Sequence, residues 1–587
     1  MPHARAILLV SIVFLAAAFS ACALYGSVPG LCDNDYCVAD AAASDAPAVD
    51  GQPDAGTSCE GGSILCDGVC VNAHDPAHCG SCANACAALD GGEAACTGDP
   101  PTCSASCPAG SHACAGSCFP NTDVPSNTSD PCVLGATYGV FVSTTTGSDD
   151  AGSGSPAAPF ATIGTGLAHA GTMARVYVCN GTYSESVSVT AGVSVFGGLS
   201  CAGGTWRYIG GQASVAPPTS APGLVVSNVT ASVDVEDITV SAAAAIGQDT
   251  SGNGLSSIAV FLNQASDVSL VRCTVVASNG ADGNPGAPGA ANPNYAAEAD
   301  GGTDGGTTAQ GGFAQESGKG GDGGVANCTN GDVSHGGVGG DANPAGGTGG
   351  GTGSSTPATA SPAGQGGGGG TVACGAGATP GSNGAPRSAG AVATSLGTLT
   401  ATGWTPTTAG AGQPGMPGQG GGGGGALDTI GGSGGGAGGC GGTGGGPGGA
   451  GGSSIALASF KSTVVLTNTT LVTGTAGSGG AGGAGESGQG GGANGPALFG
   501  CTGAFGGNGA GGGGGAGGSG GLSVCIVYGG AKPTLNAGSC STGAKGPAGD
   551  GGVGGTFGTS VLILTGSAGS PGSPGLPGVA QTSWQSP

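Results

Sequence analysis

The sequence predicts an all-β protein in which short parallel strands stack into a solenoid. Long glycine-rich loops interrupt this solenoid, and a small disulfide-rich module precedes it. Three observations lead to this fold class: an eight-residue strand pattern that recurs, the concentration of many of the 140 glycines of the 587-residue chain between copies of that pattern, and twelve cysteines within residues 59 to 132. Because glycine side chains bury no apolar surface, the foldable core is much smaller than the length suggests.

The recurring pattern is an octet with apolar residues at positions 1, 3 and 8, a polar residue at position 5 and threonine at position 7. Its copies span residues 233–240, 268–275 and 464–471. Equivalent residues of successive solenoid rungs lie about 4.8 Å apart, so the aliphatic positions would form continuous ladders. The ladder candidates are Val233, Val235, Val268, Leu270, Val464 and Leu466. Chance similarity between Val- and Thr-rich strands is the alternative, and it predicts that the octets do not stack.

A longer alignment places the glycine-rich tracts at one recurrent turn. Residues 257–260 precede the second octet just as residues 454–457 precede the third, and a jump into glycine-rich sequence follows both octets. The tracts at 280–452 and 474–521 are therefore predicted insertions into the solenoid. A fainter copy of the strand lies at 522–528, and we expect the last rung at Thr559–Leu564.

Residues 138–199 carry a resemblance to a known family. The residues that match it, in order, are Val142 to Gly147, Asp149, Pro159, Phe160, Thr162, Ile163, Ala168, Val176 to Val178, Gly181 to Tyr183, and Gly192 to Gly197. This segment resembles the opening of bacterial right-handed parallel β-helix proteins of the pectin-lyase-like kind. The resemblance implies a right-handed parallel β-helix whose open end is capped by a helical piece at Ile163–Ala170. It also makes a polysaccharide lyase or hydrolase the alternative function.

The glycine-rich tracts are expected to be disordered, because glycine loses the most backbone entropy on ordering and offers no side chain to bury. The alternative is a set of packed polyglycine II strands, in which backbones approach closely and hydrogen-bond to their neighbours. Cys328, Cys374, Cys440 and Cys501 could pin such layers. The tracts resemble polymorphic glycine-rich (PGRS) surface proteins in composition only.

The cysteine-rich stretch is predicted to be a disulfide framework that substitutes for a missing core. Its members are Cys59, Cys66, Cys70, Cys79, Cys82, Cys86, Cys96, Cys103, Cys107, Cys114, Cys118 and Cys132. Their connectivity does not follow from sequence. A zinc site at Cys79 and Cys82 with nearby histidines His74, His78 and His112 is one alternative, and a CxxC redox site is another. Residues 66–86 (CDGVCVNAHDPAHCGSCANAC) resemble the Cys-rich modules of large secreted lipoproteins of certain environmental Gram-negative bacteria, which implies an exported protein.

The N-terminus has the pattern of an export signal. Arg5 precedes an apolar run from Ala6 to Phe19, which is too short to span a bilayer. The sequence Phe19-Ser-Ala-Cys22 resembles a bacterial lipobox, which would make Cys22 the lipidated first residue, whereas Ala21-Cys-Ala23 fits ordinary signal cleavage. The acidic, low-complexity sequence that follows is a plausible tether.

Charge excludes some functions. The chain holds 9 Lys or Arg against 33 Asp or Glu, a net charge of −24, and no Lys or Arg lies between Arg5 and Arg175. Nucleic-acid binding requires clustered cations, so this class is excluded, and so is a polybasic membrane patch.

The enzyme alternative would need carboxylates in a groove. The candidates are Asp234, Glu236, Asp237 and Asp267, with Arg207 and Arg272 nearby. Because outward acids on a solenoid are usually solvated, no catalytic residue and no metal site is assigned. No cofactor is expected beyond weak Ca²⁺ binding at 320–324 and 339–341.

The sequence thus predicts a non-enzymatic cell-surface or secreted β-helix lipoprotein that acts in surface display, adhesion or extracellular matrix. The expected location is the cell envelope, at the outer membrane surface, or the medium. The expected partners are a membrane, through the lipid anchor, and polysaccharide or other cell-surface material. The predicted segments are a signal peptide (1–21), a tether (22–58), the Cys-rich module (59–132), the cap and first rungs (138–279), an insertion (280–452), a rung (453–473), a second insertion (474–521), and the last rungs with a Gly/Pro-rich tail (522–587).

Overall fold

The computed structural model describes residues 59–587 apart from 127, 129, 292–317, 344, 357–362, 371–372, 497–499, 561–562 and 564. The signal segment, Cys22 and the tether lie outside the described residues. The chain forms two compact units. The described part of the first is residues 59–88 with Glu93–Ser106, and the second is Leu89–Gly92 with Cys107–Pro587.

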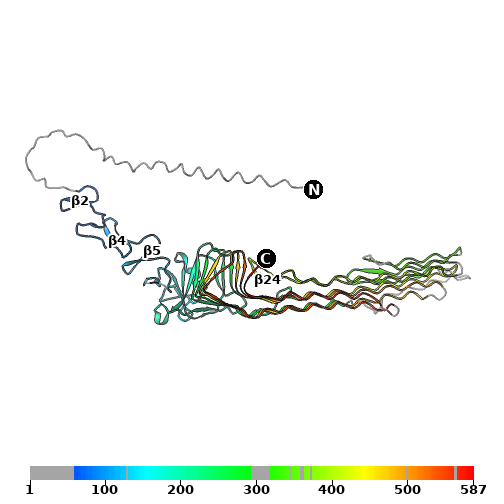
Figure 1. Cartoon of the computed structure of the whole chain (residues 1–587). Coiled ribbons are helices and arrows are strands. Elements are labelled where there is room, and N and C mark those ends of the chain that lie inside the picture. Colours follow the sequence, from blue (N-terminus) through cyan, green and yellow to red (C-terminus); the bar gives the residue numbers. More distant parts are fainter. Residues whose placement is uncertain are drawn as a thin grey trace, which may run out of the picture. The chain divides into compact units, whose positions relative to one another are not determined.

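The first unit contains two β-hairpins held by four disulfides (Figure 1). Its strands are β1 (Ser63–Cys66), β2 (Val69–Asn72), β3 (Glu93–Thr97) and β4 (Thr102–Ser106). The disulfides are Cys59–Cys70, Cys66–Cys82, Cys79–Cys96 and Cys86–Cys103. Few large apolar side chains are buried here, so these cross-links take the place of a core.

The second unit begins with a hairpin of the same design, β5 (Ser111–Cys114) and β6 (Ser117–Pro120), with disulfides Cys107–Cys118 and Cys114–Cys132. In both hairpins a CxxxC step spans the two-residue turn. Gly68 and Gly116 have φ of +86° and +90°, and the residue before each also has positive φ. Two successive positive φ angles are what the tight type I′ hairpin turn requires, which explains the glycine at this step.

The body of the second unit is a parallel β-helix of three sheets (Figure 1). Sheet 1 contains β7 (Val140–Val142), β8 (Arg175–Cys179), β11 (Ser194–Ser200), β15 (Val233–Glu236), β18 (Val268–Val271), β26 (Val464–Thr467) and β29 (Thr534–Asn536), with the short β12 (Arg207–Tyr208) antiparallel to β11. Sheet 2 contains β9 (Thr182–Tyr183), β13 (Ala213–Val215), β16 (Ile238–Ser241), β19 (Thr274–Val276), β27 (Thr470–Val472) and β30 (Ser539–Ser541). Sheet 3 contains β10 (Val187–Val189), β14 (Leu224–Ser227), β17 (Ser257–Asn263), β25 (Ser454–Phe460), β28 (Ser523–Gly529) and β31 (Ala580–Gln585). Each rung passes from sheet 1 to sheet 2 to sheet 3.

The three octets lie in stacked parallel strands, so chance similarity does not explain them. Val233 pairs with Val268, and Val268 pairs with Val464. The other ladder positions, Val235, Leu270 and Leu466, form the same stack two residues on. All six side chains are buried in the solenoid interior. The pattern therefore encodes both the strands and their register.

The polar fifth position of the octet is the turn between sheets 1 and 2. Asp237, Arg272 and Asn468 all have φ near +52°, and Ala537 continues the stack with φ +50°. Left-handed backbone is disfavoured for most residues, but Asn and Asp tolerate it best. The polar residue in each octet therefore marks a repeated sharp corner of the solenoid.

A short helix covers the first end of the solenoid. Helix α1 (Ile163–His169) packs its buried Ile163 into the core and is followed by the 3₁₀ turn η2 (Gly171–Met173). A second 3₁₀ turn, η3 (Ala202–Gly204), follows β11. Two carboxylates cap the start of α1: Glu185 accepts from the N–H groups of residues 163 and 164, and Asp149 accepts from those of residues 161 and 162. These contacts satisfy backbone donors that the helix itself leaves unpaired.

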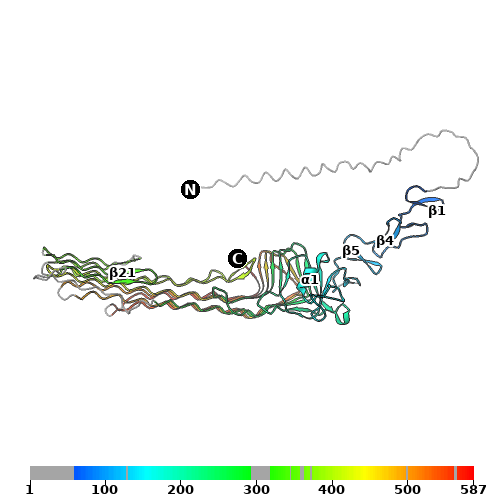
Figure 2. The same cartoon turned by 180° about the vertical axis from the view of Figure 1, so that it is seen from behind.

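Three long glycine-rich segments leave the solenoid at one recurrent turn, from sheet 2 to sheet 3. They connect β19 to β25, β27 to β28, and β30 to β31. Figures 1 and 2 show them running side by side as a bundle away from the solenoid. The first segment also forms a three-stranded antiparallel sheet, β20 (Val325–Asn327), β21 (Val333–His335) and β22 (Ser354–Thr356), and a hairpin, β23 (Thr398–Thr400) and β24 (Gly403–Thr405).

The described glycine-rich segments are ordered by hydrogen bonds, so the expectation of disorder is wrong. N–H groups of residues 477–495 donate to carbonyls of residues 434–452 at every third residue, over 2.8–2.9 Å. No glycine of residues 404–529 has a left-handed φ. A three-residue period without bonds inside the strand is the geometry of polyproline II, here as polyglycine II. Composition predicts disorder because it reflects the scarcity of side chains and not the hydrogen bonds between backbones.

Each extended strand of the glycine-rich bundle is an arm, and the central arm is residues 501–521. At positions of the central arm where another arm packs closely, only glycine fits. Successive N–H groups of residues 512, 513 and 514 donate to three different arms, at Glu486, Gln413 and Ser570. A Cβ atom on Gly512 would lie 2.0 Å from the carbonyl oxygen of Thr443. The central arm therefore has no room for a side chain at Gly512.

At the edge of the bundle only one position in three must be glycine. In residues 569–578, glycine N–H groups donate to the arm at 546–555, and carbonyls of the next residues accept from the central arm. The third position is Pro571, Pro574 and Pro577, and all three are exposed. Proline has no N–H and its φ suits this conformation. The collagen-like triplets are thus the sequence of an edge arm.

The last strand lies later than predicted. Of the predicted strand at 559–564, residues 561, 562 and 564 lie outside the described residues, and the other three are not in a strand. The strand that pairs with β28 is β31 at Ala580–Gln585. The Gly/Pro-rich segment is therefore a third insertion that ends in a strand. The prediction rested on the apolar run at 559–564, whereas β31 is polar and exposed along much of its length.

We predict that Gly512→Ala destabilises the protein by about 1–3 kcal/mol, because the added methyl group overpacks a site with no free space. Ser573→Ala, at an exposed position of the edge arm, should change the free energy of unfolding by less than about 0.5 kcal/mol. Denaturant unfolding of both variants checks this. Equal effects from both would show that the central arm is not closely packed.

We predict a pH-dependent effect of Asp149→Asn. Burial raises the pKa of Asp149, but hydrogen bonds from the Thr162 side chain and from the N–H groups of Thr162 and Ala161 outweigh it, so the pKa lies below its usual value. The carboxylate then stabilises the fold above the unfolded-state pKa of about 3.9, and this stabilisation is lost as pH falls through the lower folded-state pKa. The variant should lose about 0.5–2 kcal/mol at neutral pH. This loss should shrink below about pH 4, and Asp150→Asn at the exposed neighbouring position should show no such trend.

Candidate functional site

The predicted carboxylates come together with one arginine at the corner between sheets 1 and 2. Arg272 Nη2 lies 2.6 Å from Glu236 Oε2 and 2.8 Å from Asp237 Oδ2, and Arg272 Nε donates to Asp237 Oδ1 over 3.0 Å. The register that stacks β15 on β18 places these three side chains on adjacent rungs. We call Glu236, Asp237 and Arg272 the corner cluster.

Both carboxylates of the corner cluster are buried and hydrogen-bonded, whereas Arg272 is half-buried. Glu236 and Asp237 are 7% and 3% exposed. Ser126 Oγ donates to Glu236 Oε2 over 3.0 Å, and the Tyr208 hydroxyl donates to Asp237 Oδ2 over 3.1 Å. The hydrogen bonds that Arg272 donates to Asp237 raise the pKa of Arg272 despite its partial burial, so the guanidinium stays charged. A network of this kind holds the corner together and engages both carboxylates within the fold.

Asp234 and Asp267 do not join these ion pairs. Burial raises the pKa of Asp234, and the negative charges of Glu236 and Asp267 add to the effect. Among the ion pairs of the described residues, Arg207 is not a partner of any of these acids, and it lies exposed on β12. The sequence-predicted set therefore divides into a buried corner and outlying acids.

The outer face of sheet 1 is covered by the chain that precedes the solenoid. Phe141, Tyr177 and Phe196 form an aromatic cluster there, against which Val124 and Leu134 pack. The Tyr177 hydroxyl donates to the carbonyl of Val133, and the Arg175 guanidinium donates to the carbonyls of Asn121 and Asp123. This contact was not predicted from the sequence, although an aromatic residue occupies the same outward position in three successive strands of sheet 1.

The zinc and redox alternatives do not fit the cysteine module. Cys79 and Cys82 bond to Cys96 and Cys66, respectively, and not to each other. The rings of His74 and His78 lie 3.1 Å from backbone carbonyls. Each group of three or more potential metal ligands within the described residues includes at least two cysteines that are in disulfides. The sulfur atoms are therefore committed to cross-links.

Four further disulfides lie in the solenoid and the bundle: Cys179–Cys201, Cys328–Cys440, Cys374–Cys501 and Cys525–Cys540. Two of them join arms of the bundle, as the polyglycine II alternative suggested. Cys273 is the free cysteine of the described residues, and burial raises its pKa to about 12, so it stays a thiol in the core. Of the Ca²⁺ candidates, Asp341 uses one carboxylate oxygen to accept from the N–H of Gly320 over 2.7 Å.

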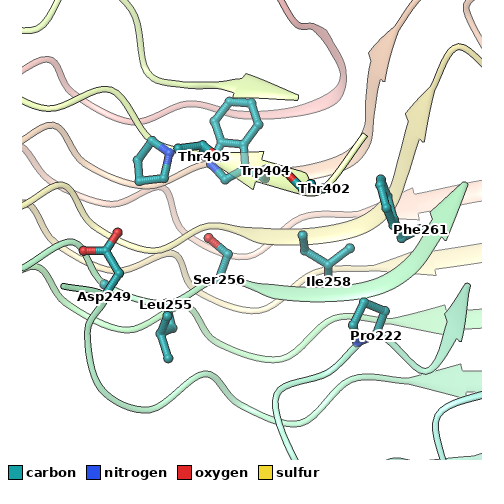
Figure 3. A pocket seen from close by; sticks show the side chains of 12 residues that line it. Pro222, Asp249, Leu255, Ser256, Ile258, Phe261, Thr402, Trp404 and Thr405 are labelled. Carbon is teal, nitrogen blue, oxygen red and sulfur yellow. The ribbon is translucent and has the colours of Figure 1, made fainter. Parts of the chain in front are cut away.

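A pocket of about 340 Å³ lies where the bundle's β23–β24 hairpin approaches sheet 3. Figure 3 shows its wall of Leu255, Ser256, Ile258 and Phe261 on one side and Thr402, Trp404 and Thr405 on the other. Asp249 is the charged residue of its lining. Trp404 is buried and meets Trp584 edge-on, with ring centroids 5.3 Å apart. The pocket was not predicted from the sequence, because its two walls lie about 140 residues apart in the chain.

We predict that Arg272→Met destabilises the protein by about 3–5 kcal/mol, because two buried carboxylates lose their counter-ion. Arg207→Met removes the same charge from an exposed strand and should cost less than about 1 kcal/mol. Denaturant unfolding at neutral pH measures both. A small effect of Arg272→Met would mean that the corner cluster is open to solvent.

Comparison with known proteins adds no further assignment. No protein-family model matches the sequence, and a search of curated proteins returned no significant match. Within the described part of the chain, no helix is both long and apolar enough to cross a membrane. The fold and the geometry of its sites therefore carry the functional argument.

Proposed function

We propose that this protein is a non-enzymatic cell-surface or secreted β-helix lipoprotein that acts in surface display, adhesion or extracellular matrix. Its first contact would be a membrane, through lipid on Cys22, and its second would be polysaccharide or other cell-surface material. The observation that carries the proposal is the bundle of polyglycine II arms that leaves one side of the solenoid. A pectin-lyase-like origin of the solenoid belongs to the same proposal.

A projecting bundle suits display because it is long for its mass. Polyglycine II rises about 3.1 Å per residue, so residues 434–452 alone span roughly 55 Å. Bonds at every third residue tie each arm to its neighbours along this length. A segment held this way acts as a spacer with a fixed direction, unlike a flexible glycine linker.

The disulfides support an exported location. The described residues contain ten disulfides and one free cysteine. Disulfides on this scale form in oxidising compartments outside the cytoplasm. Cys328–Cys440 and Cys374–Cys501 close loops of 112 and 127 residues, and cross-links across loops of this length constrain the unfolded chain strongly.

The enzyme alternative has weaker support. A glycoside hydrolase needs two carboxylates that face a substrate. Glu236 and Asp237 instead face Arg272, Ser126 and Tyr208 inside the fold. The pocket beside β17 offers one carboxylate, that of Asp249. The geometry thus favours binding and display over hydrolysis.

We predict that the full-length protein, expressed in a Gram-negative host, incorporates labelled fatty acid and is cleaved by protease added to intact cells. Cys22→Ala should abolish the label and release the protein into the medium, because the anchor is lost while the fold is retained. Cys32→Ala, which removes a different cysteine of the N-terminal segment, is the matched control and should remain labelled.

Two results would contradict the proposal. Persistent fatty-acid labelling of the Cys22→Ala protein would place the anchor elsewhere. Release of reducing or unsaturated oligosaccharides from a panel of acidic and neutral polysaccharides by the purified protein would favour the lyase or hydrolase function instead.

A further inference from the structure

The pocket beside β17 combines apolar walls with one unpaired charge. Its volume of about 340 Å³ is within the range of small-molecule sites, which are mostly apolar with a few placed polar groups. The apolar walls come from Pro222, Leu255, Ile258, Phe261, Trp404 and Pro406. Two strand-borne walls, from β17 and from the β23–β24 hairpin, make the site part of the rigid framework (Figure 3).

The carboxylate of Asp249 is held in place by its own turn. Its Oδ1 accepts from the N–H groups of Ser251 and Asn253 over 2.8 and 2.9 Å, and its Oδ2 accepts from Asn253 Nδ2 over 3.0 Å. Asn253 is 3% exposed, and its Oδ1 accepts from the N–H of Ala450 in the bundle. The exposed carboxylate is therefore held by its own turn, and Asn253 ties that turn to the bundle.

This carboxylate is ionised and has no cationic partner. Burial raises the pKa of Asp249, but the hydrogen bonds from Asn253 and Ser251 outweigh it and hold the pKa below its usual value. No Lys, Arg or His among the described residues forms an ion pair with it. Each carboxylate oxygen can accept more than the bonds it receives. The net charge of −24 also favours the approach of cations to the protein.

We propose that this pocket binds small amphipathic organic cations, with Asp249 pairing with the ammonium group and the apolar walls enclosing the hydrocarbon part. Aromatic side chains such as Phe261 and Trp404 favour cations as well as apolar groups. A neutral ligand of the same shape would gain the apolar contacts only. An anionic ligand would face the carboxylate and be rejected. This inference does not depend on the display function.

The test is binding of 2-phenylethylammonium and of 2-phenylethanol to the purified full-length protein, measured by calorimetry at low ionic strength. We expect the ammonium ligand to bind at least tenfold more tightly than the alcohol. Asp249→Asn keeps the shape and one acceptor oxygen, so it should remove this preference while it leaves binding of the alcohol unchanged. Raising the salt concentration should weaken the ammonium ligand only.

A second pair of variants tests the place of the site. Thr405→Trp fills the pocket from an exposed position of β24 and should abolish binding of both ligands. Thr400→Trp, on the neighbouring strand but outside the lining, is the matched control and should bind like the unmodified protein. Melting temperatures of all variants verify the fold. Equal affinity for the two ligands, or unchanged binding by Thr405→Trp, would overturn the proposal.

Discussion

Register between neighbouring rungs is the constraint on which the whole second unit depends. Strands β25 and β28 pair in parallel, and the same bonding continues beyond them into the bundle. Ser454 N–H donates to Leu522, and the preceding bonds run back in steps of three, from Gly451 to Ser519 down to Ser433 to Cys501. The difference in residue number stays at 68 throughout. The solenoid therefore sets the alignment of the glycine arms.

The alignment set by the solenoid explains how a glycine-rich chain overcomes the entropy cost of ordering its backbone. An isolated glycine arm would lose much backbone freedom for a few exposed hydrogen bonds. In the bundle each arm starts from a fixed strand, so the next triplet adds bonds to neighbours that are already aligned. Bonds from residues 512, 513 and 514 to three separate arms show how many partners one short stretch obtains. Cooperative backbone bonding thus takes over most of the role that a hydrophobic core has in other folds.

The sequence was most informative where side chains repeat. The octets beginning at Val233, Val268 and Val464 predicted the strands and their register, because alternating burial imposes a visible pattern. Prediction from the sequence failed for the glycine arms, because their order comes from hydrogen bonds between backbones, which leave no pattern of side chains in the sequence. It also misplaced the last strand, because β31 is pinned by pairing with β28 and not by its own hydrophobicity. The corner cluster was half predicted: the octet aligned Asp237 with Arg272, but the burial of both acids depends on Ser126 and Tyr208, which lie outside the repeat.

The triplet period has a consequence for how such a chain can change over generations. Adding or deleting three residues in one arm shifts its outer part by one turn of the helix, after which nearly every N–H again meets a carbonyl. Changes by one or two residues would turn side chains such as those of the edge prolines toward neighbouring backbones. Length can therefore drift in steps of three codons, while the solenoid and its corners stay unaltered. The length of the bundle can thus change between related sequences without any change in the solenoid that supports it.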